Sequence, residues 1–447
     1  MKSAFITPFM IRRLRFGKII AMAGAAMVAV AVWQLPWRRV PPSVILISID
    51  ALRPDHLGAY GYSRDVSPSI DRFAEQGVLF ADAVSQATWT LPSVASLFLS
   101  QYVSTHGTES LDTRMPDEAR TLAEVLRDHG YDTAAFTIGA FTSRDYGMDQ
   151  GFDHFVANGE SAEKRNDEVL KWLRRGDRRF FAYVHYVDVH YPYGRKNPYR
   201  ENFGAGYSGI VNGKQHPREI RDRLGPGDVQ HLIDLYDNGI SYADAEIGKL
   251  LSEIGRLPFG ENTVLILTAD HGEAFFEHRR MLGHRGIPYE ELIRVPLILK
   301  GPRLPAGKKI AARVEQVDIA PTIFALCGIA QPPAAQGRSL LPLLDGEASH
   351  KPYTFSEFLP YQRRAIRGPR WKLIADYKDH QHELFDLQND SAERRNRASD
   401  EPEVVAELLR ELASFVAANQ AKATATRAAV VPRSSTQDQL RALGYVE

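Results

Sequence analysis

The chain has 447 residues, of which 44% are hydrophobic and 25% are charged. This composition is typical of a globular protein with a large core, and it excludes a fibrous or disordered chain. The 55 Lys and Arg residues equal the 55 Asp and Glu residues, so no basic surplus indicates a nucleic-acid partner. Cys327 is the only cysteine, which excludes an intramolecular disulfide and a cysteine-rich zinc site.

Residues 1–40 have the pattern of a membrane anchor. An uncharged run from Ile19 to Trp37 follows the basic residues Lys2, Arg12, Arg13, Arg15 and Lys18. A helix of about 20 apolar residues spans a bilayer, and the basic flank stays cytoplasmic. We therefore predict an inner-membrane anchor with the catalytic domain outside the cytoplasm, in the periplasm or extracellular. The alternative is a cleaved signal peptide, because residues 29–31 resemble a small-residue cleavage site.

Residues 41–344 are predicted to form one α/β domain. Short, nearly continuous apolar runs alternate there with amphipathic runs, which is typical of a parallel sheet covered by helices on both faces. The predicted strands are residues 44–49, 132–138, 180–187, 263–268 and 295–299. The predicted helices are residues 69–76, 93–100, 118–129, 228–254 and 320–327.

Residues 345–447 are predicted to form a small C-terminal α+β subdomain and a tail. Residues 365–377 and 383–387 have strand patterns and residues 403–418 a helical one, whereas 420–439 are polar and are predicted to be flexible. Within the larger domain, residues 195–227 are rich in Gly, Pro and charge, and we expect a long surface loop that shapes substrate access.

Acidic and histidine residues follow three of the predicted strands. Asp50 follows the first of them, Asp188 and His190 another, and Asp270 and His271 a third. The carboxyl ends of parallel strands meet at one edge of a sheet, where open α/β sheets bind ligands. A single Asp after a strand is usually a turn or capping residue, but the set together indicates a site.

Six segments carry a resemblance to a known family. They are VILISIDALRPD (44–55), QATWTLPSVASL (86–97), TADHGE (268–273), LIRVP (292–296), VDIAPT (317–322) and ELFDL (383–387). In this order they resemble the sulfatase family of the alkaline phosphatase superfamily. The resemblance implies a mixed, mostly parallel sheet and an ester hydrolase that depends on one divalent metal ion, which can be Ca, Mn, Mg or Zn.

The resemblance also implies the roles of individual residues. Asp50, Thr90, Asp270 and His271 would bind the metal, and Thr90 would be the nucleophile, at the position where a sulfatase has its oxidised cysteine or serine. A carboxylate-rich set suits one divalent cation, and a helix start near Pro92 favours an anion. The alternative for Thr90 is an ordinary helix N-cap.

Four departures from the sulfatase pattern bear on the substrate. Threonine cannot form the aldehyde hydrate of a sulfatase. Val94 stands where the motif has arginine, residues 134–141 lack the sulfate-binding lysine and histidine, and Ala51 replaces a second aspartate. We therefore expect phosphate or phosphonate esters to be preferred over sulfate esters, as in the phosphonate monoester hydrolases and phosphoethanolamine transferases that share this resemblance.

Three further residues are candidates for contact with the substrate. His190 and His284 would hydrogen-bond the transferred group or protonate the leaving oxygen, and Arg285 would pair with a phosphoryl oxygen. The alternative for each histidine is a structural or surface role without contact to the substrate. The substrate would be a small-molecule, lipid or glycan ester. Three other functions remain open: a membrane-anchored transferase of the phosphoethanolamine type, a true sulfuric ester hydrolase, and a catalytically silent glycan-binding protein.

Overall fold

The computed structural model describes residues 40–159, 161–176, 178–193, 203–213, 215, 217–279, 281–347, 351–423 and 428–443. The chain forms two units, Met1–Pro41 and Pro42–Glu447. The predicted anchor, except Val40, and residues 195–202 of the predicted loop lie outside the described residues. Among those that are described, no helix combines the length and hydrophobicity needed to cross a membrane.

The main sheet of the second unit has, within the described residues, the strand order β10-β2-β9-β6-β1-β5-β3-β4. Five of these strands confirm predicted runs, whereas β2, β4 and β10 were not predicted. All residues of β1, β5 and β6 are buried, which explains their continuous hydrophobic runs. The bounds are β1 Ser43–Ile49, β2 Val78–Val84, β3 Asp132–Thr137, β4 His154–Ala157, β5 Phe180–Tyr186, β6 Thr263–Ala269, β9 Arg294–Lys300 and β10 Lys308–Glu315.

The sheet is mixed and mostly parallel. β1 pairs in parallel with both β5 and β6, so Ile49 lies opposite Tyr186 on one side and Ala269 on the other. β9 runs antiparallel to β6 and to β2, so the prediction of a mixed, mostly parallel sheet is confirmed, whereas the parallel direction expected for residues 295–299 from their apolar run is wrong. An apolar segment predicts that a strand is buried, but it does not predict whether the strand is parallel or antiparallel to its neighbours.

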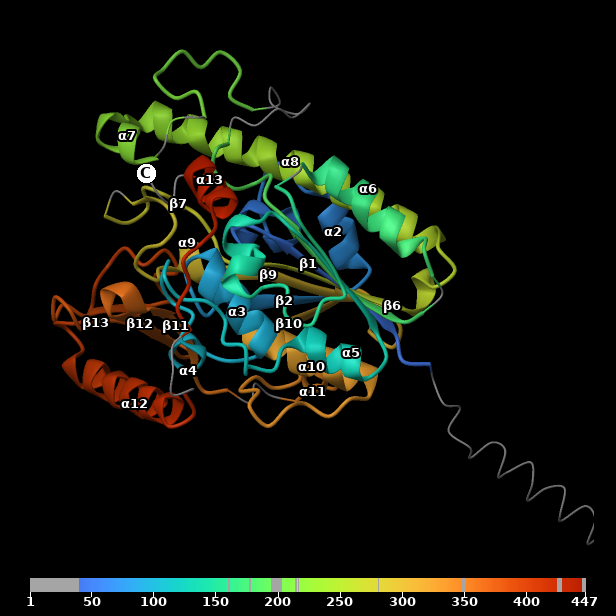
Figure 1. The fold of residues 1–447 in the computed structure, drawn as a ribbon. Helices are drawn as coiled ribbons and strands as arrows, with labels where there is room; N and C mark the ends of the chain where they lie inside the picture. The colour runs from blue at the N-terminus through green and yellow to red at the C-terminus, as the bar shows by residue number, and fades with distance from the viewer. Residues whose placement is uncertain are drawn as a thin grey trace, which may run out of the picture. The chain divides into compact units, whose positions relative to one another are not determined.

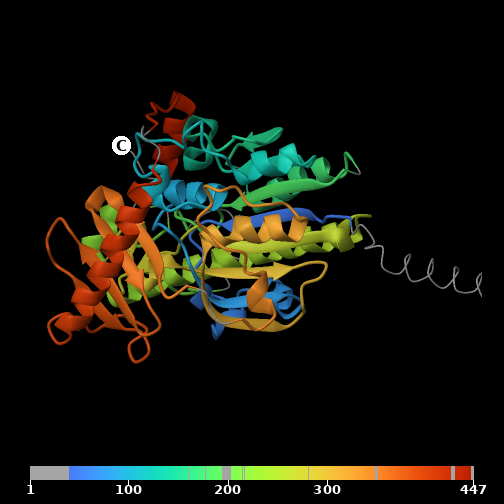
Figure 2. The same ribbon diagram turned by 90° about the horizontal axis from the view of Figure 1, so that it is seen from below.

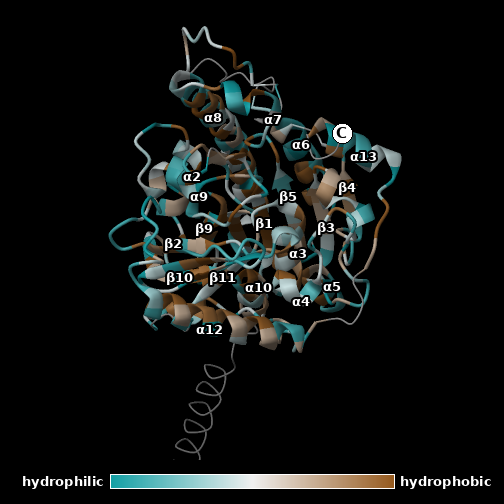
Figure 3. Cartoon of the chain, turned by 90° about the vertical axis from the view of Figure 1, so that its left-hand side faces the viewer, coloured by the Kyte–Doolittle hydropathy of each residue, from teal (hydrophilic) through white to brown (hydrophobic). Residues whose placement is uncertain are grey.

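Helices cover both faces of the sheet, as predicted. Figures 1 and 2 show α2, α6 and α8 on one face and α3, α5 and α10 on the other, and Figure 3 shows hydrophobic residues along α10 and hydrophilic ones on α2. α5 begins later than predicted because Thr121 and Glu124 form a capping box at its start. The bounds are α2 Pro68–Glu75, α3 Thr90–Leu99, α4 Val103–His106, α5 Leu122–Asp128, α6 Ala162–Leu173, α7 Pro217–Ile220, α8 Pro226–Arg256, α9 Glu290–Ile293, α10 Ile319–Cys327 and α11 Leu341–Leu344.

A small C-terminal sheet is present, in the order β11-β12-β13-β14. All its neighbouring strands are antiparallel, and α12 packs against β13. The predicted run 365–377 covers two strands joined by a turn. The bounds are β11 Thr354–Phe358, β12 Arg363–Arg367, β13 Trp371–Asp376, β14 Glu383–Asp386, α12 Pro402–Gln420 and α13 Ser434–Ala442.

The prediction of a flexible tail is wrong for the described residues 428–439. The Val430 amide donates to the Asp112 carbonyl at 2.9 Å, and the Ala140 amide donates to Gln439 Oε1 at 2.8 Å. Leu440 at the end of α13 is 2% exposed. A polar sequence can therefore be held by backbone hydrogen bonds and a single buried apolar side chain, which composition does not reveal.

Candidate active site

The carboxyl ends of β1 and β6 bring two aspartates together. Because Ile49 and Ala269 are paired neighbours, the residues that follow them, Asp50 and Asp270, emerge at the same edge. Both are about 1% exposed. The prediction that these residues, far apart in sequence, meet at one sheet edge agrees with this geometry.

The oxygens of the two carboxylates differ in their hydrogen bonds. Asp270 Oδ1 accepts hydrogen bonds from the backbone amides of His271 at 3.0 Å and Ala51 at 3.2 Å. Asp270 Oδ2 and Asp50 Oδ1 are buried and have no hydrogen-bond donor among the described residues. Buried carboxylate oxygens without donors are costly unless a cation neutralises them.

Thr90 is the first residue of α3. The N-cap residue is Trp89, and no side chain in the described part of the chain caps the helix, so the structure does not support the alternative of Thr90 as an N-cap. The Thr90 side chain is 1% exposed, and its Oγ1 lies 3.3 Å from His271 Nε2. The hydroxyl is thus at the positive end of a helix whose first amides favour an anion.

His271 lies between the two aspartates and the threonine. Its Nδ1 donates to the Gly272 carbonyl at 2.8 Å, so Nε2 carries the lone pair in the neutral ring. Nε2 is 3.4 Å from Asp50 Oδ1 and 3.5 Å from Asp270 Oδ2. Burial works to lower the pKa of His271, but the two carboxylates outweigh it and the pKa is raised. A proton and a divalent cation therefore compete for the same nitrogen.

His185, a residue that sequence reasoning missed, belongs to the same cluster. It is fully buried in β5, and its Nε2 is 3.5 Å from Asp50 Oδ2. One ligand atom each from Asp50, His185 and Asp270 lie within 4.8 Å of one another, so this group can hold a metal ion. Burial opposes ionisation of Asp50, but the imidazoles of His190, His185 and His271 hold its pKa well below the usual range.

The signal that marks His185 is its place in the strand register. It lies opposite Ser48, two residues before Asp50. Within the run FFAYVHY it looks like one polar residue in a core strand, which is why it was not singled out. Only the pairing of β5 with β1 reveals its neighbour.

His190 and His284 form a second pair beside the aspartates. Their Nε2 atoms are 3.4 Å apart. His190 Nδ1 donates to the Tyr191 carbonyl, and His284 Nδ1 lies 3.3 Å from Glu273 Oε1. Burial lowers the pKa of His190 to about 4 and raises that of Glu273 to about 7. With both Nδ1 atoms donating, the two Nε2 lone pairs would face each other, and a proton or a donor group between them would relieve their repulsion.

Arg285 lies beside the Thr90 segment. Its backbone amide donates to the Thr88 carbonyl at 3.0 Å, and its guanidinium carbon is 4.5 Å from the centre of the Trp89 ring. The stacked arginine and the start of α3 are therefore neighbours, as a role in binding an anionic group would need.

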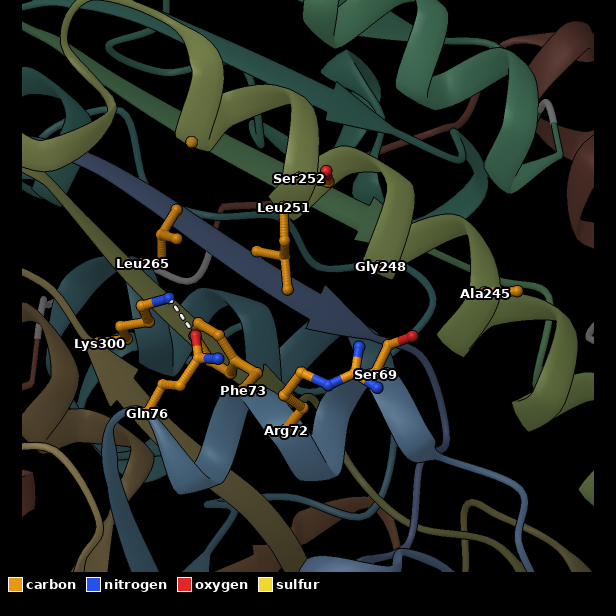
Figure 4. A pocket seen from close by; sticks show the side chains of 11 residues that line it. Ser69, Arg72, Phe73, Gln76, Ala245, Gly248, Leu251, Ser252, Leu265 and Lys300 are labelled. Carbon is orange, nitrogen blue, oxygen red and sulfur yellow. Dashed lines mark hydrogen bonds between the residues drawn. The ribbon is translucent and has the colours of Figure 1, made fainter.

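Other residues of the sequence prediction lie elsewhere. Asp188 Oδ1 accepts from the Ala162 amide at 3.3 Å, so this carboxylate faces the start of α6. Val94, at the position of the family's arginine, is a buried core residue. A groove of about 350 Å³ between α2 and α8 (Figure 4) includes Leu265 near the amino end of β6, and none of the candidate residues lines it.

The comparisons with known proteins agree with this arrangement. Residues 42–329 match the model of the Sulfatase family, and residues 272–420 match the C-terminal model of N-sulphoglucosamine sulphohydrolase. The chain belongs to the sulfatase family. Its fold is that of the sulfatase and alkaline phosphatase superfamily, and the chain is an ester hydrolase, as predicted. Members of this family depend on a metal ion.

Relatives within the sulfatase family span most of the chain. A Delta 4,5-hexuronate-2-O-sulfatase of Bacteroides thetaiotaomicron is 26% identical and covers 80% of this chain and 85% of its own. Arylsulfatase K of Mus musculus is 25% identical and covers 84% and 79%. The crystal structure of the phosphonate monoester hydrolase of Agrobacterium radiobacter has a TM-score of 0.70 at 21% identity, covering 85% and 96%, which shows a shared fold.

Proposed function

We propose that this chain is a metal-dependent hydrolase of phosphate or phosphonate esters in which Thr90 is the nucleophile. The observation that carries the proposal is the position of the Thr90 hydroxyl. It is buried at the start of α3, 3.3 Å from His271 Nε2 and beside the aspartate cluster. A plain capping threonine has no need of these neighbours.

Asp50, Thr90, Asp270 and His271 would hold the ion, which when bound supplies a Lewis acid that polarises the substrate and favours loss of the Thr90 proton. The buried carboxylate oxygens that lack hydrogen-bond donors among the described residues fit this role. The rest of the chemistry belongs to the chain's own residues.

In the proposed reaction Thr90 Oγ1 attacks phosphorus and releases its proton to solvent. The bond from phosphorus to the leaving oxygen breaks, that oxygen takes up a proton through His190 and His284, and the pair regains this proton from solvent. Water then attacks the phosphothreonine, which restores the threonine hydroxyl and releases phosphate or phosphonate. Arg285 and the first amides of α3 would bind the non-bridging oxygens.

The preference for phosphorus rests on the chemistry of threonine. A sulfatase releases sulfate from an aldehyde hydrate without attack on sulfur. The Cβ of Thr90 carries a methyl group and cannot become an aldehyde, so its ester must be cleaved at the central atom. This route is usual for phosphorus. In addition, Val94 replaces the arginine of the sulfatase motif, and Ala51 replaces a second aspartate. The fold shared with phosphonate monoester hydrolases is compatible with such a reaction.

A second candidate is a sulfuric ester hydrolase. It is favoured by the names of the relatives, which include a Delta 4,5-hexuronate-2-O-sulfatase and several arylsulfatases K. In that case the physiological substrate would be a sulfated glycan or small molecule. Thr90 would then form a covalent sulfate ester whose hydrolysis is slow.

A substrate panel separates the two candidates. Residues 42–447 would be assayed with p-nitrophenyl phosphate, p-nitrophenyl phenylphosphonate, bis-p-nitrophenyl phosphate and p-nitrophenyl sulfate. The variants would be Thr90→Val, which keeps shape but removes the hydroxyl, and Thr90→Ser, which keeps the hydroxyl. Thr88→Val is a matched control, because Thr88 Oγ1 donates to the Gly286 carbonyl at 3.2 Å and not to the cluster.

We expect turnover of phosphorus esters, a loss of at least about 10³-fold in Thr90→Val, and partial activity in Thr90→Ser. Preferential turnover of the sulfate would favour the second candidate. Full activity in Thr90→Val would refute the nucleophile, and no turnover of any ester with metal present would support a silent glycan-binding protein.

We also propose, from the sequence pattern of residues 1–40, that the chain is anchored in the inner membrane with its catalytic domain outside the cytoplasm. A lipid or glycan hydroxyl could then replace water as the acceptor and make the protein a transferase. Fractionation and protease accessibility of the tagged full-length chain in spheroplasts test the anchor. Recovery of the catalytic domain in the soluble cytoplasm would contradict it.

A further inference from the structure

His185 has its two ring nitrogens in different environments. Nδ1 lies 2.9 Å from the hydroxyl of the buried Tyr183, whereas Nε2 is 3.5 Å from Asp50 Oδ2 and has no hydrogen bond to the described residues. If Nδ1 carries the proton and donates it to Tyr183, the Nε2 lone pair points at the aspartate cluster. This is how a protein fixes the tautomer of a metal-binding histidine.

The spacing of the donor atoms is compatible with a metal cage. Thr90 Oγ1 to His271 Nε2 is 3.3 Å, His271 Nε2 is 3.4 and 3.5 Å from the two aspartates, and His185 Nε2 to Asp50 Oδ2 is 3.5 Å. These distances exceed the usual N–H···O length of about 2.9–3.0 Å. Donors that share an ion at about 2.0–2.2 Å are separated by roughly 3.0–3.5 Å, which fits the cluster.

The chemical type of the donors bears on which ion fits. Ala51 leaves the position after Asp50 without a carboxylate, and its amide donates to Asp270 Oδ1. The neighbouring strand supplies an imidazole instead. Ca²⁺ and Mg²⁺ take oxygen donors, whereas imidazole nitrogens suit Zn²⁺ and related transition metals. Two carboxylates balance a divalent ion, so neutral imidazoles add donors without repelling an anionic ester.

We propose that His185 is a ligand of the ion and makes the site selective for Zn²⁺-type transition metals over Ca²⁺ and Mg²⁺. The inference rests on the proposed function, because it concerns the ion that would assist Thr90. His185 and His271 would provide two nitrogens, Asp50 and Asp270 two carboxylates, and Thr90 one hydroxyl.

The test measures metal binding directly. The full-length protein would be stripped with a chelator and titrated separately with Zn²⁺ and Ca²⁺, with bound metal measured by mass spectrometry and the melting temperature recorded. Co²⁺ loading adds a visible spectrum that reports nitrogen ligands. The variants are His185→Ala, His185→Asp and Asp50→Asn, and the control is His154→Ala, a partly exposed histidine on β4. His185→Asn replaces His185→Ala if the latter does not fold.

We expect wild type to bind one Zn²⁺ much more tightly than Ca²⁺. His185→Ala should lose Zn²⁺ affinity by about 100-fold or more and change the Co²⁺ spectrum, and His185→Asp should narrow the preference for Zn²⁺ over Ca²⁺. Loss of metal in Asp50→Asn but unchanged affinity, selectivity and spectrum in His185→Ala would overturn this inference and leave the proposed function standing. Unchanged binding in both variants, or none in wild type, would overturn both.

Discussion

Lys372 on β13 is expected to hold the C-terminal sheet to the catalytic domain. Its side chain is fully buried, with Nζ 3.0 Å from Glu290 Oε1 and 2.8 Å from Glu393 Oε1. Glu290 begins α9, a few residues after Arg285, and Glu393 lies in the loop that follows β14. We expect Lys372→Met, which keeps the length of the side chain and removes its charge, to destabilise the fold.

The expected loss follows from the burial of all three groups. Removing one partner of a buried ion pair costs about 3–5 kcal/mol. Burial raises the pKa of Glu393 to about 7 even though Lys372 opposes the rise. Without Lys372 the carboxyl takes up a proton at neutral pH, which keeps the cost near the lower limit of about 3 kcal/mol. This corresponds to roughly a hundredfold rise in the unfolded fraction.

Urea unfolding followed by circular dichroism would measure the effect. The matched control is Arg174→Met, because Arg174 is 56% exposed and pairs with Glu253 at 3.1 Å, so its loss should stay within about 1 kcal/mol. Adding Glu393→Gln to Lys372→Met should cost less than the sum of the single changes, since it removes the carboxyl left without a partner. A Lys372→Met midpoint equal to that of Arg174→Met would refute the reasoning.

Three further outcomes are expected. Burial lowers the pKa of His106 to about 3 from 6.5. As the pH falls below 6.5, this histidine is therefore protonated in the unfolded chain before it is protonated in the folded one. The free energy of unfolding should then fall by up to about 1.4 kcal/mol per pH unit between pH 6.5 and pH 3. His106→Gln should flatten this slope in urea midpoints at pH 7 and 5, and an unchanged slope would refute it. Glu273→Gln weakens the orientation of His284 and should lower kcat about 10–100-fold with unchanged metal content; wild-type kinetics would contradict this. Gln439→Ala removes the bond to the Ala140 amide and should cost about 1 kcal/mol in unfolding with kcat unchanged, whereas a large loss of kcat would show that α13 shapes the site.

The sequence alone predicts the strands whose local pattern matches their burial. The fully buried β1, β5 and β6 are continuous apolar runs and were found within one or two residues. β2 and β10 were missed because β2 contains the partly buried Asp82, and β10, at the sheet edge, has only three buried residues of eight. The direction of β9 is set by its pairing with strands that are distant in the sequence, and a hydrophobic run contains no information about that pairing.

The same limit applies to the site. Asp50, Asp270 and His271 follow strands directly, so the rule that parallel strands end at one edge was enough to group them. His185 lies inside a strand, and its role depends on the register that sets it opposite Ser48. Glu273 appears in the motif, but its contact with His284 depends on the β7–β8 hairpin (Ala274–Phe275 and Leu282–Gly283), which is too short to recognise from the sequence.

The central claim is that Thr90 carries the covalent intermediate. The most direct measurement is to mix the enzyme with ³²P-labelled p-nitrophenyl phosphate, quench with acid during the first turnover, and locate the label by peptide mass spectrometry. We expect one phosphoryl group on Thr90 in wild type and none in Thr90→Val. Label on another residue, or rapid turnover by Thr90→Val with no labelled peptide, would contradict the threonine mechanism.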